Sequence, residues 1–427
     1  MNTSKLIDFL QGGGMDARLA ALYGKKALPH QRLRYQKALA AFEKRYGNMP
    51  DVRVFSVSGR SELLGNHTDH NHGCVIAAAV DLDIIAVAAA TNDTVVRVTS
   101  EGYPEDVVDI SDFTAPCEAH YAKSDALIAG MCQGFQKNGH RVGGFVAYTT
   151  SSVLKGSGLS SSAAFEVMIG NIQNHLYNSG NVDNREIATI AQYAENVFFG
   201  KPCGLMDQMA CAVGGIIAID FSNAAHPVIE KLTPDLTKMG YALAIVNTGG
   251  NHADLTPEYA AVPAEMKAVA TAMGKAVLSE VSEQAVIAAT PKLRETVGDR
   301  ALLRALHFFG ENRRVAAGKK ALAQKDIALF LETVRDSGRS SFCYLQNVYT
   351  TKNVAEQGLS LALCLAERFL KDKEGAWRVH GGGFAGTVQA FVKEADTQEF
   401  ATMMNAVFGE GACMMLTIRP EGAIAVI

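Results

Sequence analysis

The sequence contains no long hydrophobic run. No stretch approaches the roughly 18 consecutive apolar residues that a membrane-spanning helix requires, and the closest candidate, residues 84–90, is short and strand-like. Residues 1–19 also lack the apolar region and the small-residue cleavage site of a secretory signal. From both absences we expect a cytoplasmic protein with no membrane partner.

An excess of charge of one sign and a pattern of paired cysteines are also absent. The chain has 40 Lys and Arg residues against 44 Asp and Glu residues, and the basic residues are scattered rather than clustered. This balance argues against binding to nucleic acid. Eight cysteines without a Cys-x-x-Cys pair predict reduced thiols rather than a disulfide framework or a zinc site.

The chain does have the length and apolar content of a protein with two or three domains, since 48% of its 427 residues are hydrophobic. It has no repeat or flexible linker, so the domains are expected to abut. Helical patterns are predicted at residues 15–46, 160–176, 183–200 and between about 260 and 370, and strands at 52–57, 82–90, 144–149, 215–220, 242–247, 377–379 and 387–392. Because helices and strands do not alternate regularly, the pattern favours an α+β fold.

The strongest chemical signal is the segment at residues 155–164, which reads Lys-Gly-Ser-Gly-Leu-Ser-Ser-Ser-Ala-Ala. It lies between a predicted strand and a predicted helix. Glycines let backbone N–H groups close around phosphate oxygens, hydroxyls add donors, and a helix N-terminus supplies positive potential. The segment therefore predicts a cradle for the phosphates of a nucleotide, although it is not a Walker loop. The alternative is a Gly/Ser turn that only caps the helix.

A second glycine cluster, residues 380–386, formally satisfies the G-x-G-x-x-G pattern of a dinucleotide-binding dehydrogenase. That pattern requires a helix directly after it, whereas residues 387–392 alternate like a strand. We therefore predict a tight turn between two strands at this position, with a close approach of the backbone to another group.

Polar side chains are concentrated at residues 59–72, after the strand predicted at 52–57. Such density is expected where a polyhydroxyl ligand is held by many directional hydrogen bonds. His67, His70 and His72 also invite a metal interpretation, but their spacing matches no standard zinc arrangement. Further along, the acidic residue Asp207 follows a glycine-containing turn and, taken by itself, is typical of a solvated loop.

In combination, these segments resemble the galactokinase branch of the GHMP kinases, the superfamily of sugar, homoserine, mevalonate and phosphomevalonate kinases. Residues 59–71, 156–163 and 381–386 resemble the three family motifs in order, and residues 194–196 and 204–208 resemble the magnesium and catalytic segments. The resemblance implies a two-lobed α+β kinase with its active site in the cleft between the lobes. The N-terminal lobe, residues 1–230, would be like a ribosomal-protein domain, and the C-terminal lobe, residues 231–427, would be ferredoxin-like.

The same resemblance implies transfer of phosphate from ATP to a sugar, with Mg²⁺, by a monomer or weak homo-oligomer. Asp207 would be the catalytic base. Arg60 would be its electrostatic partner, or would lower the pKa of the attacking hydroxyl. The implied sugar contacts are Asn66, His67, Asp69, Gly204 and Tyr259; the implied ATP contacts are Gly156, Ser157, Gly158, Leu159, Ser160, Ser161 and Ser162; the implied Mg²⁺ ligands are Ser162 and Glu195.

Departures from the family pattern bear on the choice of sugar. Asn66 stands where the family usually has glutamate, and Glu62 stands where it usually has asparagine. Loss of a carboxylate near the C6 end of the sugar would lower like-charge repulsion toward a sugar acid. Galactose is the first expectation, with galacturonate and N-acetylgalactosamine as alternatives. A non-catalytic sensor of sugar and ATP on the same fold is a further alternative, which the retention of the whole implied catalytic and metal-binding set disfavours.

Overall fold

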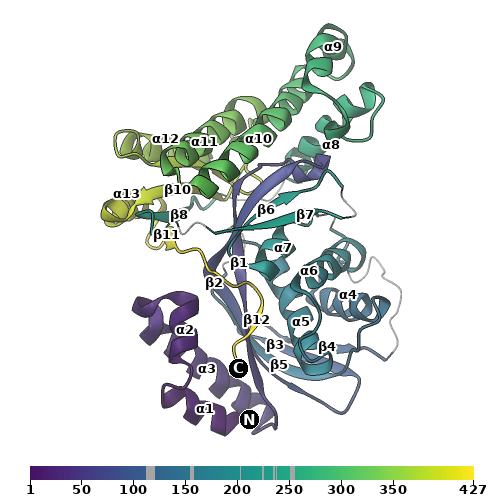
Figure 1. Ribbon diagram of the computed structural model, residues 1–427, viewed down its shortest axis with the longest axis vertical. Coiled ribbons are helices and arrows are strands. Elements are labelled where there is room, and N and C mark those ends of the chain that lie inside the picture. The colour runs from purple at the N-terminus through teal and green to yellow at the C-terminus, as the bar shows by residue number, and fades with distance from the viewer. Residues whose placement is uncertain are drawn as a thin grey trace.

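The computed structural model describes residues 1–111, 121–153, 158–201, 203–223, 226–233, 236, 238–250 and 255–427. It contains an eight-stranded sheet and a four-stranded sheet, with helices packed against both (Figure 1). The α+β architecture expected from the sequence is thereby confirmed. Among the described residues, no helix is both long enough and apolar enough to cross a membrane.

The large sheet combines strands from the first half of the chain with one strand from the C-terminus. Its order is β12-β1-β2-β5-β3-β4, and β6 pairs with both β2 and β7. The strands are antiparallel except for the parallel pair of β3 and β5. Their bounds are β1 (Arg53–Leu64), β2 (Cys74–Ala90), β3 (Val95–Ser100), β4 (Glu105–Asp109), β5 (Phe145–Ser151), β6 (Ile216–Asp220), β7 (Val228–Leu232) and β12 (Ile424–Ala425).

Helices cover both faces of the large sheet because the long strand β2 is apolar on both sides. Successive side chains of a strand point to opposite faces. Ile85 and Val87 pack in the core beneath the N-terminal helices, which are α1 (Thr3–Gln11), α2 (Asp16–Tyr23) and α3 (Leu28–Tyr46). Ile84 and Ala86 pack in the core on the other face, whose helices are α4 (Ser124–Lys137), α5 (Ser161–Tyr177), α6 (Asn184–Tyr193) and α7 (Met206–Val213).

The small sheet has the order β11-β8-β10-β9 and is antiparallel throughout. Helices α12 and α13 share its core on one face. Helix α11 packs from the other side, where Phe330 meets Phe391 of β10 edge to face at 5.3 Å. Helices α8 to α11 extend this lobe at the top of Figure 1. The bounds are β8 (Tyr241–Asn247), β9 (Ala376–His380), β10 (Thr387–Lys393), β11 (Cys413–Leu416), α8 (Thr256–Ala272), α9 (Glu283–Thr296), α10 (Asp299–Gln324), α11 (Ile327–Ser340), α12 (Gly358–Leu370) and α13 (Thr397–Phe408).

Two sequence predictions have clear outcomes at the strand level. The tight turn predicted at residues 380–386 is confirmed, because β9 and β10 pair directly with His380 opposite Thr387; the dinucleotide-fingerprint alternative is wrong. The strand predicted at 52–57 is too short, since β1 continues to Leu64 through register shifts at Ser58/Arg60 and Glu62/Leu64. Such irregularities re-aim side chains next to functional sites. The lobe boundary near residue 230 stays a prediction.

A buried carboxylate joins the N-terminal helices to the large sheet and to the C-terminal segment. Asp83 of β2 is fully buried and accepts hydrogen bonds from Tyr23, Ser56, Arg34 and, at 3.0 Å, Arg419. Burial by itself raises the pKa of Asp83, but the charges of Arg34 and Arg419 outweigh it and hold this pKa below its usual value. The carboxylate is therefore ionised at neutral pH, and its charge is compensated from both ends of the chain.

We predict that Asp83→Asn lowers the free energy of unfolding by about 3 kcal/mol at pH 7, because Arg34 and Arg419 would then be left without a counter-ion. Since the folded-state pKa of Asp83 lies below its unfolded value, this stabilisation is complete above about pH 4 and is lost as the pH falls through the folded pKa. Urea unfolding followed by circular dichroism, at pH 7 and in acid, measures the difference. An equal gap between wild type and variant at both pH values would contradict the prediction.

Candidate active site

An arginine and an aspartate from distant parts of the chain meet between β1 and α7. Arg60 of β1 and Asp207 of α7 form a bidentate pair, with Nε–Oδ1 and Nη2–Oδ2 distances of 2.7 and 2.5 Å. The remaining guanidinium nitrogen, Nη1, donates to the carbonyl of Gly158, and the Ser160 hydroxyl donates to Asp207. Bidentate pairs of this kind fix orientation as well as charge. The two residues predicted to work together are therefore brought together beside the predicted phosphate loop.

The electrostatic balance of this pair keeps the aspartate ionised. Desolvation raises the pKa of Asp207, but the charge and hydrogen bonds of Arg60, with the bond from Ser160, hold it below its usual value. Desolvation likewise lowers the pKa of Arg60, and the Asp207 charge outweighs it. The Arg60 side chain is 8% exposed and the Asp207 side chain 32%. The carboxylate thus remains accessible to a ligand while its counter-ion is buried behind it.

The predicted phosphate loop leads directly into the N-terminus of α5. Gly158 has φ +71°, Ser160 has φ +57°, and the helix begins at Ser161. Leu159 is fully buried, and its carbonyl accepts a hydrogen bond of 3.2 Å from the Arg60 backbone N–H. Gly156 and Ser157, two of the predicted ATP contacts, lie outside the described residues. The described part offers the helix N-terminus that favours a bound phosphate.

The two predicted metal ligands lie together on neighbouring helices. Ser162, in the first turn of α5, donates to Glu195 Oε1 at 3.5 Å. Glu195 lies on the π-helical segment η4 (Ala194–Phe198) and is also bound by Lys201 Nζ at 3.0 Å and by Gln208 Nε2 at 2.7 Å. A hydroxyl and a carboxylate are oxygen donors of the kind Mg²⁺ takes, and Mg²⁺ commonly uses only one or two protein ligands beside phosphates. Within the described ranges, no group of three or more His, Cys, Asp or Glu side chains could hold a metal by itself.

Four of the predicted sugar contacts, Asp69, Gly204, His67 and Tyr259, lie on segments that meet one another. Asp69 lies on the short helix η2 (Asp69–Asn71), and its carboxylate packs so closely on Gly204 that a Cβ there would lie 2.1 Å from Oδ2. His67 Nε2 is 3.1 Å from the Gly382 carbonyl. Tyr259 of α8 donates to the Gly383 carbonyl at 2.8 Å. The turn between β1 and β2, the loop before α7, helix α8 and the β9–β10 turn therefore converge.

His67 is held as a neutral ring in this group. Its pKa is lowered to about 4, first by burial and then by the neighbouring ring of His70, whose centroid is 6.0 Å away. A neutral imidazole is able both to donate and to accept a hydrogen bond. That property suits a sugar hydroxyl, which also does both.

Asn66 departs from the expectation of a direct sugar contact. It is 1% exposed, and its Nδ2 donates to Glu62 at 3.2 Å and to the Gly381 carbonyl at 2.9 Å. Its Oδ1 accepts from Asn347 at 2.9 Å and from Ser341 at 3.3 Å. An amide has two N–H donors and two acceptor lone pairs, so protein groups satisfy all four. The geometry makes Asn66 a connector between the lobes, and a ligand would have to replace one of these bonds.

Glu62, which stands where the family usually has asparagine, also points into the protein. It is 5% exposed and accepts a hydrogen bond of 2.7 Å from Arg378 of β9, which is fully buried. Burial raises the pKa of Glu62 more than the Arg378 charge lowers it. The charge at this position is therefore bound to the C-terminal lobe rather than directed at a ligand.

Two residues that sequence reasoning did not single out also belong to the site. His380 is buried beneath Gly158 and bridges Ser61 at 3.0 Å and Thr387 at 2.9 Å. Gln208 joins Glu195 to a second buried carboxylate, Glu166, at 3.2 Å. His380 lies in the glycine-rich segment 380–386, and Gln208 lies in the segment 204–208 beside Asp207. The sequence pattern of these two segments was the available signal for both residues. Their partners could not be read from the chain because they come from other elements.

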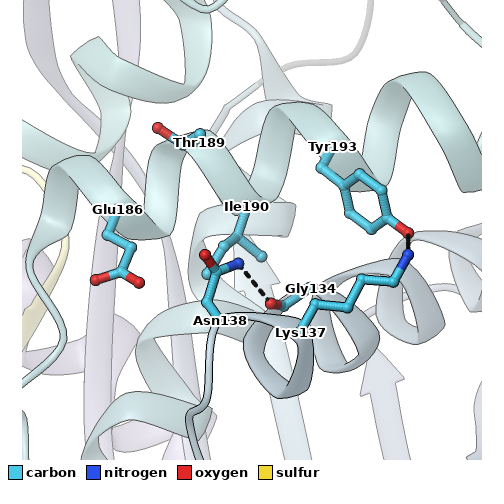
Figure 2. Close-up of a pocket in the computed structure, with 7 residues that line it drawn as sticks. All are labelled: Gly134, Lys137, Asn138, Glu186, Thr189, Ile190 and Tyr193. Carbon is cyan, nitrogen blue, oxygen red and sulfur yellow. Dashed lines mark hydrogen bonds between the residues drawn. The ribbon is translucent and has the colours of Figure 1, made fainter. Parts of the chain in front are cut away.

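A separate small pocket lies between α4 and α6, outside this site (Figure 2). It has a volume of about 170 Å³ and is lined by Gly134, Lys137, Asn138, Glu186, Thr189, Ile190 and Tyr193. Lys137 donates to the Tyr193 hydroxyl at 2.5 Å, and Glu186 is 2.7 Å from His140. Asn138 donates to a backbone carbonyl at 2.8 Å. Its polar side chains are therefore engaged within the protein, and the candidate site is the group of residues around Arg60 and Asp207.

Two parts of the chain match known protein families. Residues 40–90 match the galactokinase galactose-binding signature, and residues 126–215 match the GHMP kinases N terminal domain. These two ranges contain Arg60, Asp69, Ser162, Glu195 and Asp207.

Solved structures share the fold over most of the chain. The galactokinase of Lactococcus lactis complexed with galactose superposes with a TM-score of 0.76 at 24% identity, covering 90% of this chain and 98% of that one. The mevalonate kinase of Methanococcus jannaschii gives 0.61 at 14% identity, with 86% and 99% covered. The phosphomevalonate kinase of Streptococcus pneumoniae gives 0.58 at 13% identity, with 85% and 98% covered. These structures show that the chain has the fold of these kinases, and the two sequence matches, each over part of the chain, indicate a phosphotransferase whose acceptor is an alcohol group.

Proposed function

We propose that this protein is a sugar 1-kinase that transfers the γ-phosphate of ATP to the anomeric hydroxyl of galactose, giving galactose 1-phosphate. The observation that carries the proposal is the position of the Arg60–Asp207 pair. One side of Asp207 adjoins the loop that leads into α5, through Ser160. On the other side we place the sugar, because Gly204, three residues before Asp207, packs against Asp69, and Asp69 belongs to the matched galactose-binding signature. A phosphate donor and a sugar held on these two sides would meet at the carboxylate.

In the proposed reaction, Asp207 orients the attacking hydroxyl and accepts its proton as the new bond to phosphorus forms. Because the pKa of Asp207 is held low, the carboxylate is a weak base, so proton transfer accompanies bond formation rather than preceding it. Arg60 holds the carboxylate in place and offsets negative charge near the transferred phosphoryl group. Bound through Ser162 and Glu195, Mg²⁺ would neutralise charge on the phosphate oxygens.

The buried state of Glu62 bears on the alternative substrates. Its charge is bound to Arg378 inside the protein, and Asn66 is neutral. No carboxylate of this pair is therefore directed at the ligand to repel an acidic sugar. Galacturonate and N-acetylgalactosamine remain alternative acceptors, and a non-catalytic sensor remains the alternative of another class.

We predict that Asp207→Asn lowers kcat for the sugar by about a thousandfold, because the amide keeps the shape of the side chain but cannot accept the proton. ATP binding, measured by calorimetry, should be largely retained. Asp299→Asn is the matched control, since Asp299 is an exposed partner of Arg294 on the C-terminal helices. A kcat for Asp207→Asn within tenfold of wild type would remove Asp207 from the role of base.

We predict that Glu195→Gln raises the Mg²⁺ concentration needed for half-maximal activity by about tenfold or more, because it removes the charged metal ligand. Titration of Mg²⁺ at fixed ATP and sugar measures the shift. An unchanged Mg²⁺ requirement would show that Glu195 is not a ligand.

We predict that galactose has the highest kcat/KM among galactose, galacturonate and N-acetylgalactosamine in a coupled assay of ADP release. The reason is that the matched signature is for galactose. A large preference for either modified sugar would overturn the choice of substrate. Sugar and ATP binding without ADP release would favour the sensor.

A further inference from the structure

The turn that carries His67 and Asp69 has a backbone that needs external support. Gly65 has φ +106°, where a Cβ would lie 2.6 Å from the Cα of Val75, and His67 has φ +60°. Left-handed conformations at residues other than glycine cost free energy and persist only where the surroundings fix them. The groups that bind this backbone therefore decide where the His67 and Asp69 side chains point.

One of these groups is a buried carboxylate on α10. Glu311 is fully buried, and its Oε1 accepts hydrogen bonds from the backbone N–H groups of Gly65 at 3.0 Å and Asn66 at 3.3 Å. The same oxygen accepts from Ser337 of α11 at 2.6 Å, and Oε2 accepts from Arg314 at 2.7 Å. Hydrogen bonds between backbone N–H groups and an ionised carboxylate are about twice as strong as neutral ones. Glu311 therefore fixes the start of the turn.

A second group lies one helical turn earlier on the same face of α10. His307 is fully buried, with Nε2 3.0 Å from the carbonyl of Asn66 and Nδ1 2.9 Å from the Ser340 hydroxyl. The carbonyl can only accept, so Nε2 carries the proton and Nδ1 accepts from Ser340. The helix thus binds both the N–H and the C=O of Asn66.

The end of the turn is bound by the same lobe. Asn312, next to Glu311, accepts a hydrogen bond of 2.7 Å from the Cys74 backbone N–H, where β2 begins. Asn71 Oδ1 accepts a hydrogen bond of 3.2 Å from the Leu278 backbone N–H, which follows α8. The backbone is therefore held from the helical part of the C-terminal lobe on both sides of His67 and Asp69.

From these contacts we propose that Glu311 and His307 are positioning residues for the sugar. They act through the backbone of residues 65–66 and set the places of His67 and Asp69. The inference rests on the proposed function, since it takes His67 and Asp69 as sugar contacts. Neither Glu311 nor His307 is exposed to the cleft, so neither is a catalytic residue.

The test is Glu311→Met, which keeps the length of the side chain and removes the acceptor oxygens. We expect the KM for the sugar to rise by about tenfold or more, because small misplacements of binding groups are costly, while the KM for ATP stays near that of wild type. We also expect faster amide hydrogen exchange in the peptide covering residues 65–72, a readout that does not depend on activity.

Two further variants separate positioning from general stability. Glu311→Gln retains an oxygen for the three donors at Oε1, and Arg314, whose side chain is 19% exposed, is able to turn toward solvent. We expect it to keep the sugar KM within about threefold of wild type. Glu265→Met is the matched control, because Glu265 binds Arg300 and Arg304 of the same helix without touching the turn. It should leave both the sugar KM and exchange at residues 65–72 unchanged.

The outcomes are distinguishable. An unchanged KM for the sugar together with unchanged hydrogen exchange in Glu311→Met would overturn the inference. It would also be overturned if Glu311→Met and Glu265→Met both raised the KM for the sugar and the KM for ATP to the same extent. If Glu311→Met does not fold, His307→Phe, which removes only the bond to the Asn66 carbonyl and the bond to Ser340, must show the same selective effects. If wild-type protein phosphorylates no sugar, the proposed function fails, and hydrogen exchange still decides whether α10 holds the turn.

Discussion

The bidentate bond between Arg60 and Asp207 is the interaction on which the site depends. It joins β1 to α7, and through Gly158 and Ser160 it joins both to the loop that leads into α5. Burial alone would favour a neutral aspartic acid, so the carboxylate needs the guanidinium behind it to stay charged. The same bond fixes the direction of the carboxylate. The orientation and the charge of the Asp207 carboxylate thus have one physical cause.

The seam between the lobes follows the same rule of compensated buried charge. Glu62 is bound by Arg378 across the seam, and Glu311 is bound by Arg314 while it holds the turn that carries His67 and Asp69. Buried ion pairs add little net stability compared with apolar packing, but they are strongly destabilising when one partner is lost. Here these ion pairs fix geometry, because the hydrogen bonds within each pair form in only a few directions. The C-terminal lobe thereby determines the shape of a turn that belongs to the N-terminal lobe.

Local patterns predicted much of this architecture, and distant contacts account for what they missed. The helical pattern at residues 183–200 correctly predicted α6, which Asp183 caps, and alternation at residues 387–392 correctly predicted a strand after the glycine cluster. The motif resemblance brought Arg60 and Asp207 together, although they are 147 residues apart. Neither pattern could reveal that Glu311, 246 residues from Gly65, binds the turn. The sequence also could not show that protein groups satisfy every hydrogen bond of the Asn66 side chain, because three of its four partners are more than 270 residues away along the chain.

Arg60 keeps Asp207 ionised at its position beside the predicted phosphate loop. The most direct measurement is a ¹³C NMR titration of the Asp207 side-chain carboxyl, assigned by comparison with Asp207→Asn, in wild type and in Arg60→Met. In wild type the resonance should show no titration above about pH 4. In Arg60→Met its midpoint should move upward, because burial then acts without a compensating charge. The same midpoint in both proteins would contradict the account.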